Sequence, residues 1–298
     1  MKGDLAIVSG SDAAYFGLLR GLVRAIRESP ELAATPLYIF DAGLAPDQLT
    51  WLAEHGAVIT KPHWSFARTV PGFIAMLATR PRIPQCFPGH EVYLWIDADA
   101  WPQQVEAVAT YRRAALAKGF AVTPETHPAY NNAELAKAHR RIRGWFGPNV
   151  VAVLEGTAPI NLGVFAGAAD APHWGVWRKR VDDWLTASTS QEVDFNADQT
   201  AFNMVVHVDR LETELLPARY NWICHTAPPM ATADGETLLE PVAPYPPLSM
   251  VHMTLWTKKG PQSLATPEGG RVSRPLTYKG EALPGDGAAL PDFALPDL

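Results

Sequence analysis

The 298-residue sequence has little cysteine, no long apolar run and no basic run, and each absence excludes a class of protein. Cys86 and Cys224 are its only cysteines, which excludes a disulfide framework and a thiolate metal cluster. No stretch approaches the roughly 20 apolar residues that a membrane helix needs, and the N-terminus turns polar too early for a signal peptide. The lack of a run rich in Lys and Arg argues against a nucleic-acid-binding surface. We therefore expect a cytoplasmic protein with no integral membrane segment and no nucleic-acid partner.

What the sequence does contain is an ordinary apolar fraction, 47%, and a regular alternation of strand and helix patterns. Short apolar runs that predict strands alternate with segments whose apolar residues recur at helical spacing. This rhythm predicts an α/β fold with a mostly parallel central sheet flanked by helices, in a single domain over residues 1–260. We expect strands at residues 5–9, 37–40, 57–60, 92–96, 120–123, 162–165 and 250–255, and helices at 15–27, from 46, and at 103–118, 174–185 and 198–206.

Two further features concern packing. Trp174, Trp177 and Trp184 are three of ten tryptophans and are spaced for one buried helix face, which favours a core role over a platform for sugars. In residues 261–298 Pro and Gly become dense and the periodicity fades, which predicts a surface-wrapping or mobile tail.

The strongest chemical signal is the pair of carboxylates, Asp97 and Asp99, that follows the apolar strand at 92–96. Open α/β sheets bind ligands beyond the carboxyl ends of their strands. Residues i and i+2 of a regular strand point to the same face, so both carboxylates could hold one divalent cation. Oxygen ligands suit Mg²⁺ or Mn²⁺, which would bridge to a diphosphate. Asp-x-Asp alone is also typical of solvated turns and helix caps, so its place after a buried strand is what favours function.

Several motifs, in the same order along the chain, resemble those of family 8 glycosyltransferases, the group that includes glycogenin and bacterial lipopolysaccharide galactosyltransferases. They cover residues 5–260 and are specific as an ordered set. The resemblance implies a GT-A type nucleotide-binding fold and a metal-dependent enzyme that moves a hexose from a nucleotide sugar, UDP-linked by analogy with the family, to an acceptor hydroxyl with retention at the anomeric carbon. The acceptor, a glycan, lipid or protein, stays open. The motifs are residues 80–88 leading into 92–99, residues 9–15 after the first strand, residues 161–164, Asp198-Gln199, and the pair His252 and Lys258.

The resemblance also implies a role for each matching residue. Mn²⁺ or Mg²⁺ would be held by Asp97, Asp99 and His252. Asp198 and Gln199 would be catalytic, beside the anomeric carbon, where they stabilise the positive charge that develops on the sugar. The nucleotide would bind Gly10, Ser11, Asp12, Tyr15 and Lys258, and the donor sugar would bind Arg80, Asn161 and Gly163.

Three positions depart from the family pattern. Ala13 and Ala14 stand where relatives often carry polar residues, which weakens the implied contacts to base and ribose. Leu255 stands where the family has Gly in its His-x-x-Gly-x-x-Lys segment, and a side chain there predicts a crowded diphosphate or a shifted loop.

Two alternatives from other classes remain open at this stage. A haloacid-dehalogenase-like phosphatase also places Asp-x-Asp after an apolar strand, and Asp97 would then be its nucleophile. That motif usually opens such a domain, whereas here three strands precede it. The other alternative is a non-catalytic protein that binds a nucleotide or carbohydrate.

Overall fold

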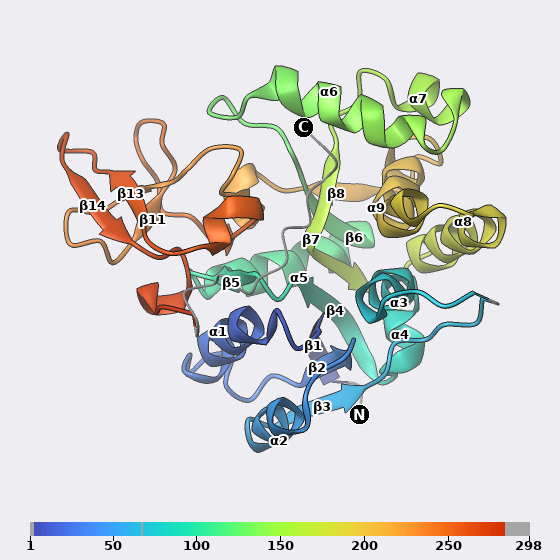
Figure 1. Ribbon diagram of the computed structural model, residues 1–298, viewed down its shortest axis with the longest axis horizontal. Helices are drawn as coiled ribbons and strands as arrows, with labels where there is room; N and C mark the ends of the chain where they lie inside the picture. Colours follow the sequence, from blue (N-terminus) through green and yellow to red (C-terminus); the bar gives the residue numbers. More distant parts are fainter. Residues whose placement is uncertain (1–2, 67, 284–298) are drawn as a thin grey trace.

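The computed structural model describes residues 3–66 and 68–283, and at its centre lies a seven-stranded sheet with the order β3-β2-β1-β4-β7-β6-β8 (Figure 1). Neighbouring strands are parallel except around β7, which runs antiparallel to both β4 and β6. The predicted α/β fold with a mostly parallel sheet is therefore confirmed. The strands are β1 (Gly3–Ser11), β2 (Leu37–Asp41), β3 (Ala57–Thr60), β4 (His90–Ile96), β6 (Phe120–Pro124), β7 (Ile160–Ala168) and β8 (Thr213–Leu215).

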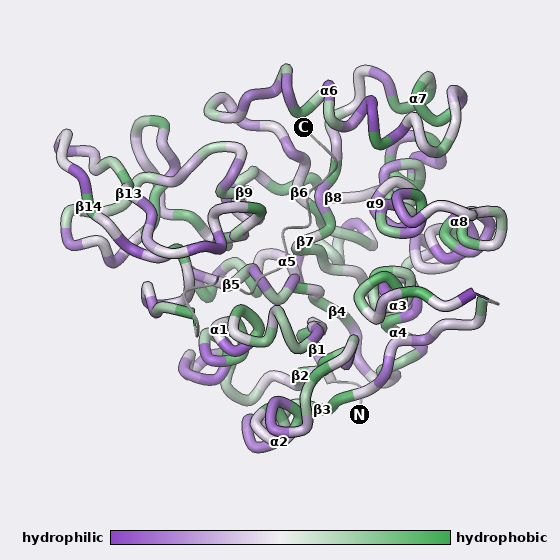
Figure 2. Tube along the Cα trace, viewed as in Figure 1, coloured by the Kyte–Doolittle hydropathy of each residue, from purple (hydrophilic) through white to green (hydrophobic). Residues whose placement is uncertain are grey.

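Helices cover both faces of the sheet, which explains why β4 is apolar on both sides. On one face Tyr93 and Trp95 pack with the aromatic side chains of α3, α8 and α9, and on the other Leu94 and Ile96 pack with α1, α2 and α5. Hydrophobic residues accordingly line the strands and the inner sides of these helices in Figure 2. The helices are α1 (Phe16–Arg27), α2 (Pro46–Glu54), α3 (Gly72–Thr79), η1 (Arg80–Arg82), α4 (Ile83–Cys86), α5 (Glu106–Lys118), α8 (His173–Ala187) and α9 (Gln191–His207).

Two of the three tryptophans of α8 belong to the core, as predicted, and the third, Trp184, is partly buried against it. Trp174 is 7% exposed and Trp177 is fully buried, and the indole N–H of Trp177 donates to the main-chain oxygen of Asp198 at 2.7 Å. This tryptophan stripe thus joins α8 to α9 within the core on this face of the sheet.

The predicted start of α9 was wrong. We expected a helix over residues 198–206, but α9 begins at Gln191, so Asp198 lies inside the helix. Ser190 is the N-cap, since its hydroxyl accepts from the N–H of Val193 at 3.3 Å, and acidic residues in the first turn favour the positive end of the helix dipole.

A smaller lobe, on the left in Figure 1, contains the strand that carries His252. Here β5 (Ala100–Pro102), β12 (Met250–His252) and β9 (Trp222–Ile223) form a three-stranded sheet. The strand predicted at 250–255 is therefore shorter, and it leads into the 3-10 helix η3. The remaining elements are η2 (Ala218–Asn221), β10 (Met230–Ala231), β11 (Leu238–Leu239), η3 (Leu255–Lys258), β13 (Gln262–Ala265), β14 (Arg271–Arg274) and η4 (Tyr278–Gly280).

The segment predicted as a tail begins with the hairpin of β13 and β14. Leu264 and Leu276, each 1% exposed, pack into the core of the smaller lobe with Trp101 and Trp222. Residues 284–298 of this segment lie outside the described residues.

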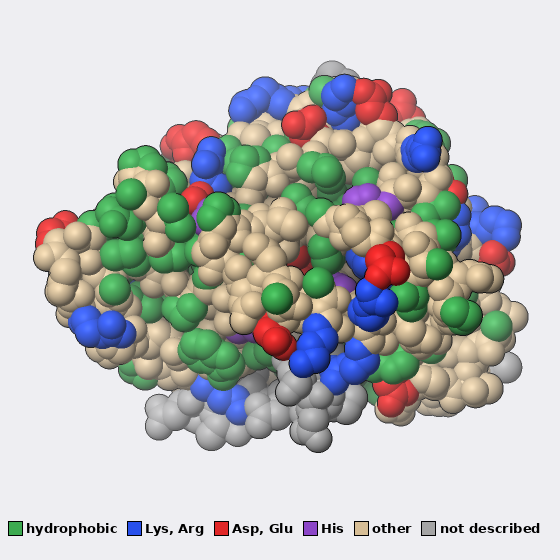
Figure 3. Space-filling model, turned by 90° about the horizontal axis from the view of Figure 1, so that it is seen from above, with side chains coloured by type: hydrophobic (Ala, Val, Ile, Leu, Met, Phe, Trp, Pro, Cys, Tyr) green, Lys and Arg blue, Asp and Glu red, His purple; other side chains and the backbone are tan. Residues whose placement is uncertain are grey.

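Two helices, α6 (Asn132–Gly144) and α7 (Pro148–Leu154), form a pair between β6 and β7 and pack on α9, at the top of Figure 1. Among the described residues, no helix combines the length and the apolar character needed to cross a bilayer. On the face shown in Figure 3, Lys and Arg side chains are interspersed with Asp and Glu.

Candidate functional site

The site lies at the point where the strand order of the central sheet reverses, between β1 and β4. From β1 the chain builds β2 and β3 on one side and then crosses back to place β4 on the other. The loops that follow β1 and β4 diverge at such a point, so it is where open α/β sheets bind ligands. Asp12 directly follows β1 and Asp97 directly follows β4, so residues from two of the predicted motifs meet at this edge.

The two carboxylates lie in a turn and not in a strand as expected. β4 ends at Ile96, and the N–H of Ala100 donates to the main-chain oxygen of Asp97 at 2.9 Å. The N–H of Asp97 donates in turn to the main-chain oxygen of Gly163 at 2.7 Å. The turn, and not strand alternation, therefore directs both side chains to one point.

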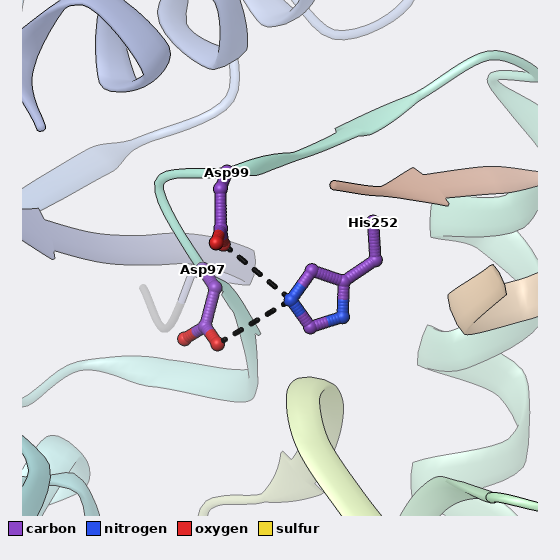
Figure 4. A group of neighbouring side chains, drawn as sticks. All are labelled: Asp97, Asp99 and His252. Atoms are coloured by element: carbon purple, nitrogen blue, oxygen red, sulfur yellow. Dashed lines mark ion pairs between the residues drawn. The ribbon is translucent and has the colours of Figure 1, made fainter. Parts of the chain in front are cut away.

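His252 reaches that point through strand pairing. β12 runs antiparallel to β5 with His252 opposite Ala100, and the N–H of Met253 donates to the main-chain oxygen of Asp99 at 2.9 Å. Its Nε2 atom lies 3.4 Å from Oδ1 of Asp99 and 3.9 Å from Oδ2 of Asp97 (Figure 4). The structure therefore brings together the three residues that the resemblance implied as metal ligands.

These three side chains fit a divalent cation. Their ligand atoms all lie within 4.8 Å of one another. Two carboxylates with one imidazole are a donor set that Mn²⁺ accepts more readily than Mg²⁺, which prefers oxygen alone. The Asp97 side chain is 28% exposed, so the cluster is open on one side to a further ligand.

The surroundings of the cluster shift the pKa values of the two carboxylates in opposite directions. Although burial opposes it, the Lys258 ammonium, 2.6 Å from Oδ2 of Asp99, and His252 hold the pKa of Asp99 well below its usual range. Burial raises the pKa of Asp97 to about 6, against the opposing charge of Arg80 and with the help of Asp99. Although burial opposes this too, Asp99 and Asp97 raise the pKa of His252.

Lys258 also lies 4.6 Å from the ring centre of Tyr15, a cation–π distance. Tyr15 is half-buried and packs against the core of the smaller lobe. Its N–H donates to Oδ1 of Asp12 at 3.1 Å. Asp12, Tyr15 and Lys258, which the resemblance assigns to the nucleotide, are thus linked beside Asp99.

Gly10 and Ser11 do not lie in a loop after the first strand, where they were expected. Both belong to β1, which extends beyond the predicted end at residue 9. A Cβ atom on residue 10 would lie 2.3 Å from the sulfur of Met76, and Ser11 is 2% exposed with its hydroxyl donating to the main-chain oxygen of Asp12. Packing against α3 and the shape of the following turn account for these two residues.

Arg80 and Asp198 form a buried ion pair behind the carboxylates. They are 3% and 2% exposed, and Nε of Arg80 donates to Oδ2 of Asp198 at 2.6 Å. Nη1 of Arg80 donates to the main-chain oxygen of Leu162 at 2.8 Å and lies 3.6 Å from Oδ1 of Asp97. Arg80 therefore holds Asp198 and adds positive charge beside Asp97, with most of its donors already used by the protein.

Asn161, Gly163 and Gln199 lie next to this pair. Oδ1 of Asn161 accepts from the N–H of Gly163 at 2.7 Å, and Oε1 of Gln199 accepts from the N–H of Leu162 at 3.2 Å. The absence of a side chain at residue 163 admits His252, because a Cβ there would lie 2.2 Å from Cε1 of the imidazole.

Sequence reasoning missed four polar residues in this region: Glu125, His139, Asn221 and His225. Oε2 of Glu125 accepts from Nε2 of His139 at 2.7 Å, and this contact, against the effect of burial, lowers the pKa of Glu125. Burial lowers the pKa of His225 to about 4. Glu125 directly follows β6 as Asp97 follows β4, a signal that could have identified it. His139 lies within the polar helix α6, Asn221 ends a short 3-10 helix and His225 lies in a turn after β9, and none of these places carries such a signal.

No protein-family model and no curated protein matches the sequence, but solved structures match the fold. Galactosyltransferase LgtC in complex with donor and acceptor sugar analogs matches with a TM-score of 0.53 at 13% identity, over 85% of this chain and 88% of that one. An active-site mutant of LgtC matches with a TM-score of 0.54 at 13% identity, over 83% and 86%. The apo bifunctional glycosyltransferase WbbM matches with a TM-score of 0.52 at 11% identity, over 75% of this chain, which spans only 40% of the WbbM chain. The fold of this chain is thus that of GT-A glycosyltransferases.

Proposed function

We propose that this chain is a metal-dependent glycosyltransferase that moves a hexose from a nucleotide sugar, UDP-linked, to an acceptor hydroxyl. The observation that carries the proposal is the convergence of Asp97, Asp99 and His252 at the ligand-binding edge of a fold shared with LgtC. An Asp-x-Asp turn alone is common, but here a histidine from a separate strand places its Nε2 atom 3.4 Å from Oδ1 of Asp99 and 3.9 Å from Oδ2 of Asp97.

The residues of the chain divide the work. Asp97, Asp99 and His252 would hold Mn²⁺, which when bound supplies a Lewis acid to the diphosphate. Lys258 places a second positive charge beside Asp99, where the departing diphosphate gains negative charge. Asp198, held by Arg80, and Gln199, held by Leu162, stabilise positive charge on the sugar. With retention, the departing phosphate oxygen takes the acceptor's proton, so no separate general base is required.

The test is a calorimetric and activity panel on the full chain. We expect UDP to bind in the presence of Mn²⁺ and more weakly without it, and one UDP-hexose to be hydrolysed slowly in the absence of an acceptor. Phosphate release from a simple phosphomonoester without UDP binding would overturn the proposal in favour of the phosphatase. UDP binding with neither hydrolysis nor transfer across a broad acceptor panel would overturn it in favour of a binding protein.

A further inference from the structure

A line of buried hydrogen bonds runs from His252 away from the carboxylates. Nδ1 of His252 lies 2.9 Å from Oδ1 of Asn221, and Nδ2 of Asn221 donates to Oδ1 of Asn161 at 2.9 Å. Nδ2 of Asn161 donates to Oε1 of Glu125 at 2.8 Å. Asn221 and His252 are 1% and 4% exposed, and Glu125 is 7% exposed, so water does not replace these partners freely.

Glu125 at one end of this line and the main-chain N–H of Gly163 determine which group donates in each hydrogen bond. Glu125 is an ionised carboxylate, which can only accept, so Asn161 must present its NH₂ group to it. The main-chain N–H of Gly163, which can only donate, fixes the oxygen of Asn161 from the other side. Asn221 must therefore donate to that oxygen and turn its own oxygen toward His252.

This direction sets the protonation of the imidazole. An amide oxygen can only accept, so Nδ1 of His252 carries the proton that it shares with Asn221. The neutral ring then has its lone pair on Nε2, the atom that faces Asp97 and Asp99. Metal-binding histidines generally donate their other ring N–H in this way, and the partner fixes tautomer and ring orientation.

We propose that Asn221 is a positioning residue that holds His252 in the tautomer able to bind a metal, with Asn161 and Glu125 fixing the orientation of its amide. The inference rests on the proposed metal site and adds Asn221 and Glu125, which no motif assigns; Asn161, which the resemblance assigned to the donor sugar, gains a second role. Within the part of the chain that the structure describes, the side chain of Asn221 bonds Asn161 and His252 and neither carboxylate, so it acts through His252.

Removing the acceptor has a specific consequence. In Asn221→Leu, a proton on Nδ1 would be buried without a partner, whereas a proton on Nε2 finds Oδ1 of Asp99 at 3.4 Å. The proton therefore moves to Nε2, and the ring loses the lone pair that faces the cation. Asn221→Asp keeps an acceptor of the same shape and retains the proton on Nδ1.

The first experiment reads the tautomer directly, by long-range ¹⁵N–¹H NMR of the ring of His252 in the metal-free full chain at alkaline pH, where the ring is neutral. We expect Nδ1–H in the wild type and in Asn221→Asp, and Nε2–H in Asn221→Leu. Asn196→Leu, which removes another buried amide whose hydrogen bond among the described residues lies within α9, is the matched control and should keep Nδ1–H. An Nε2–H signal in the wild type overturns the proposal even if no variant folds.

The second experiment measures Mn²⁺ binding by electron paramagnetic resonance, with Mn²⁺ alone as the probe. We expect an affinity about 10- to 100-fold weaker in Asn221→Leu, with Asn221→Asp closer to the wild type. Equal affinity in wild type and Asn221→Leu contradicts the positioning role. Failure of the glycosyltransferase proposal is distinguishable, because it concerns donor hydrolysis and leaves the tautomer result standing.

Discussion

The imidazole of His252 occupies the space in which residue 163 would carry its side chain. A Cβ atom there would lie 2.2 Å from Cε1 and 2.7 Å from Nδ1 of the ring, and 2.9 Å from Oδ1 of Asn161. Real Cβ atoms do not approach other atoms so closely, so the glycine in β7 and the histidine in β12 depend on each other. Glycine at this position thus makes room for the imidazole that faces Asp97 and Asp99, in addition to the donor-sugar contact that the resemblance implied.

The first prediction follows from this contact. Gly163→Ala should displace His252 from the carboxylates and weaken Mn²⁺ binding at least 10-fold, an effect of the size seen when a metal site loses the orientation of a ligand. Titration of Mn²⁺ by electron paramagnetic resonance measures it. Gly175→Ala is the control, since a Cβ on this exposed residue of α8 meets no atom within 4 Å, and it should bind Mn²⁺ as the wild type does. Unchanged binding in Gly163→Ala would show that the cation does not use His252.

The second prediction concerns Asp99. Asp99→Ala should abolish Mn²⁺-dependent UDP binding while the chain stays folded, because the variant loses a cation ligand and also the partner of Lys258 at 2.6 Å. Calorimetry with UDP and Mn²⁺ provides the measurement. Asp182→Ala removes a carboxylate that pairs with Arg82 elsewhere and should leave binding intact. A similar Mn²⁺-dependent UDP affinity in Asp99→Ala would exclude the metal assignment.

A part of the fold or of the site could be predicted where its signal lies in neighbouring residues, and not where it depends on residues far apart in the sequence. β4 is buried on both faces, so it appears in the sequence as an unbroken apolar run, and Asp97 directly after it could be recognised. By contrast, β5 is only three residues long and shows no period, so the pairing that carries His252 to Asp99 could not be derived from the residues. Only the resemblance to family 8 indicated His252.

Other parts of the site depend on tertiary contacts alone. Asn221 sits at the end of a short 3-10 helix, and its role exists only because Asn161 and His252 lie on either side of it. The start of α9 was missed because its first turns are polar and half-exposed, and the antiparallel direction of β7 was not specified because an apolar run carries no sign of direction.

The third prediction concerns Leu255, at the position where the family has Gly. Its φ is 49°, in the left-handed region that glycine favours, so the loop keeps the backbone of a glycine under a leucine side chain. Leu255→Val should lower the free energy of unfolding by about 1–2 kcal/mol, because β-branching disfavours this conformation further. Leu255→Gly should be tolerated within about 1 kcal/mol, because relief of strain offsets the flexibility of the unfolded chain. Urea unfolding compares the two, and a less stable glycine variant than valine variant would contradict the argument.

The fourth prediction is a pH dependence away from the site. Burial lowers the pKa of His173 to about 4. The side chain is 2% exposed, its Nε2 bonds Thr213 at 3.0 Å, and its Nδ1 has no partner among the described residues. The unfolded state, with a pKa near 6.5, binds more protons than the folded state between these two values, so the free energy of unfolding falls as pH drops through that window.

The expected size is up to about 3 kcal/mol, since each pKa unit corresponds to about 1.4 kcal/mol. His173→Gln keeps a donor for Thr213 but does not titrate, so its unfolding free energy should fall less between pH 6.5 and about 4 than that of the wild type. Urea unfolding at a series of pH values isolates the contribution of His173 as the difference between the two curves. Parallel curves would contradict the prediction, because they would mean that the folded protein does not lower the pKa of His173 although its ring stacks on Phe120 and Phe202.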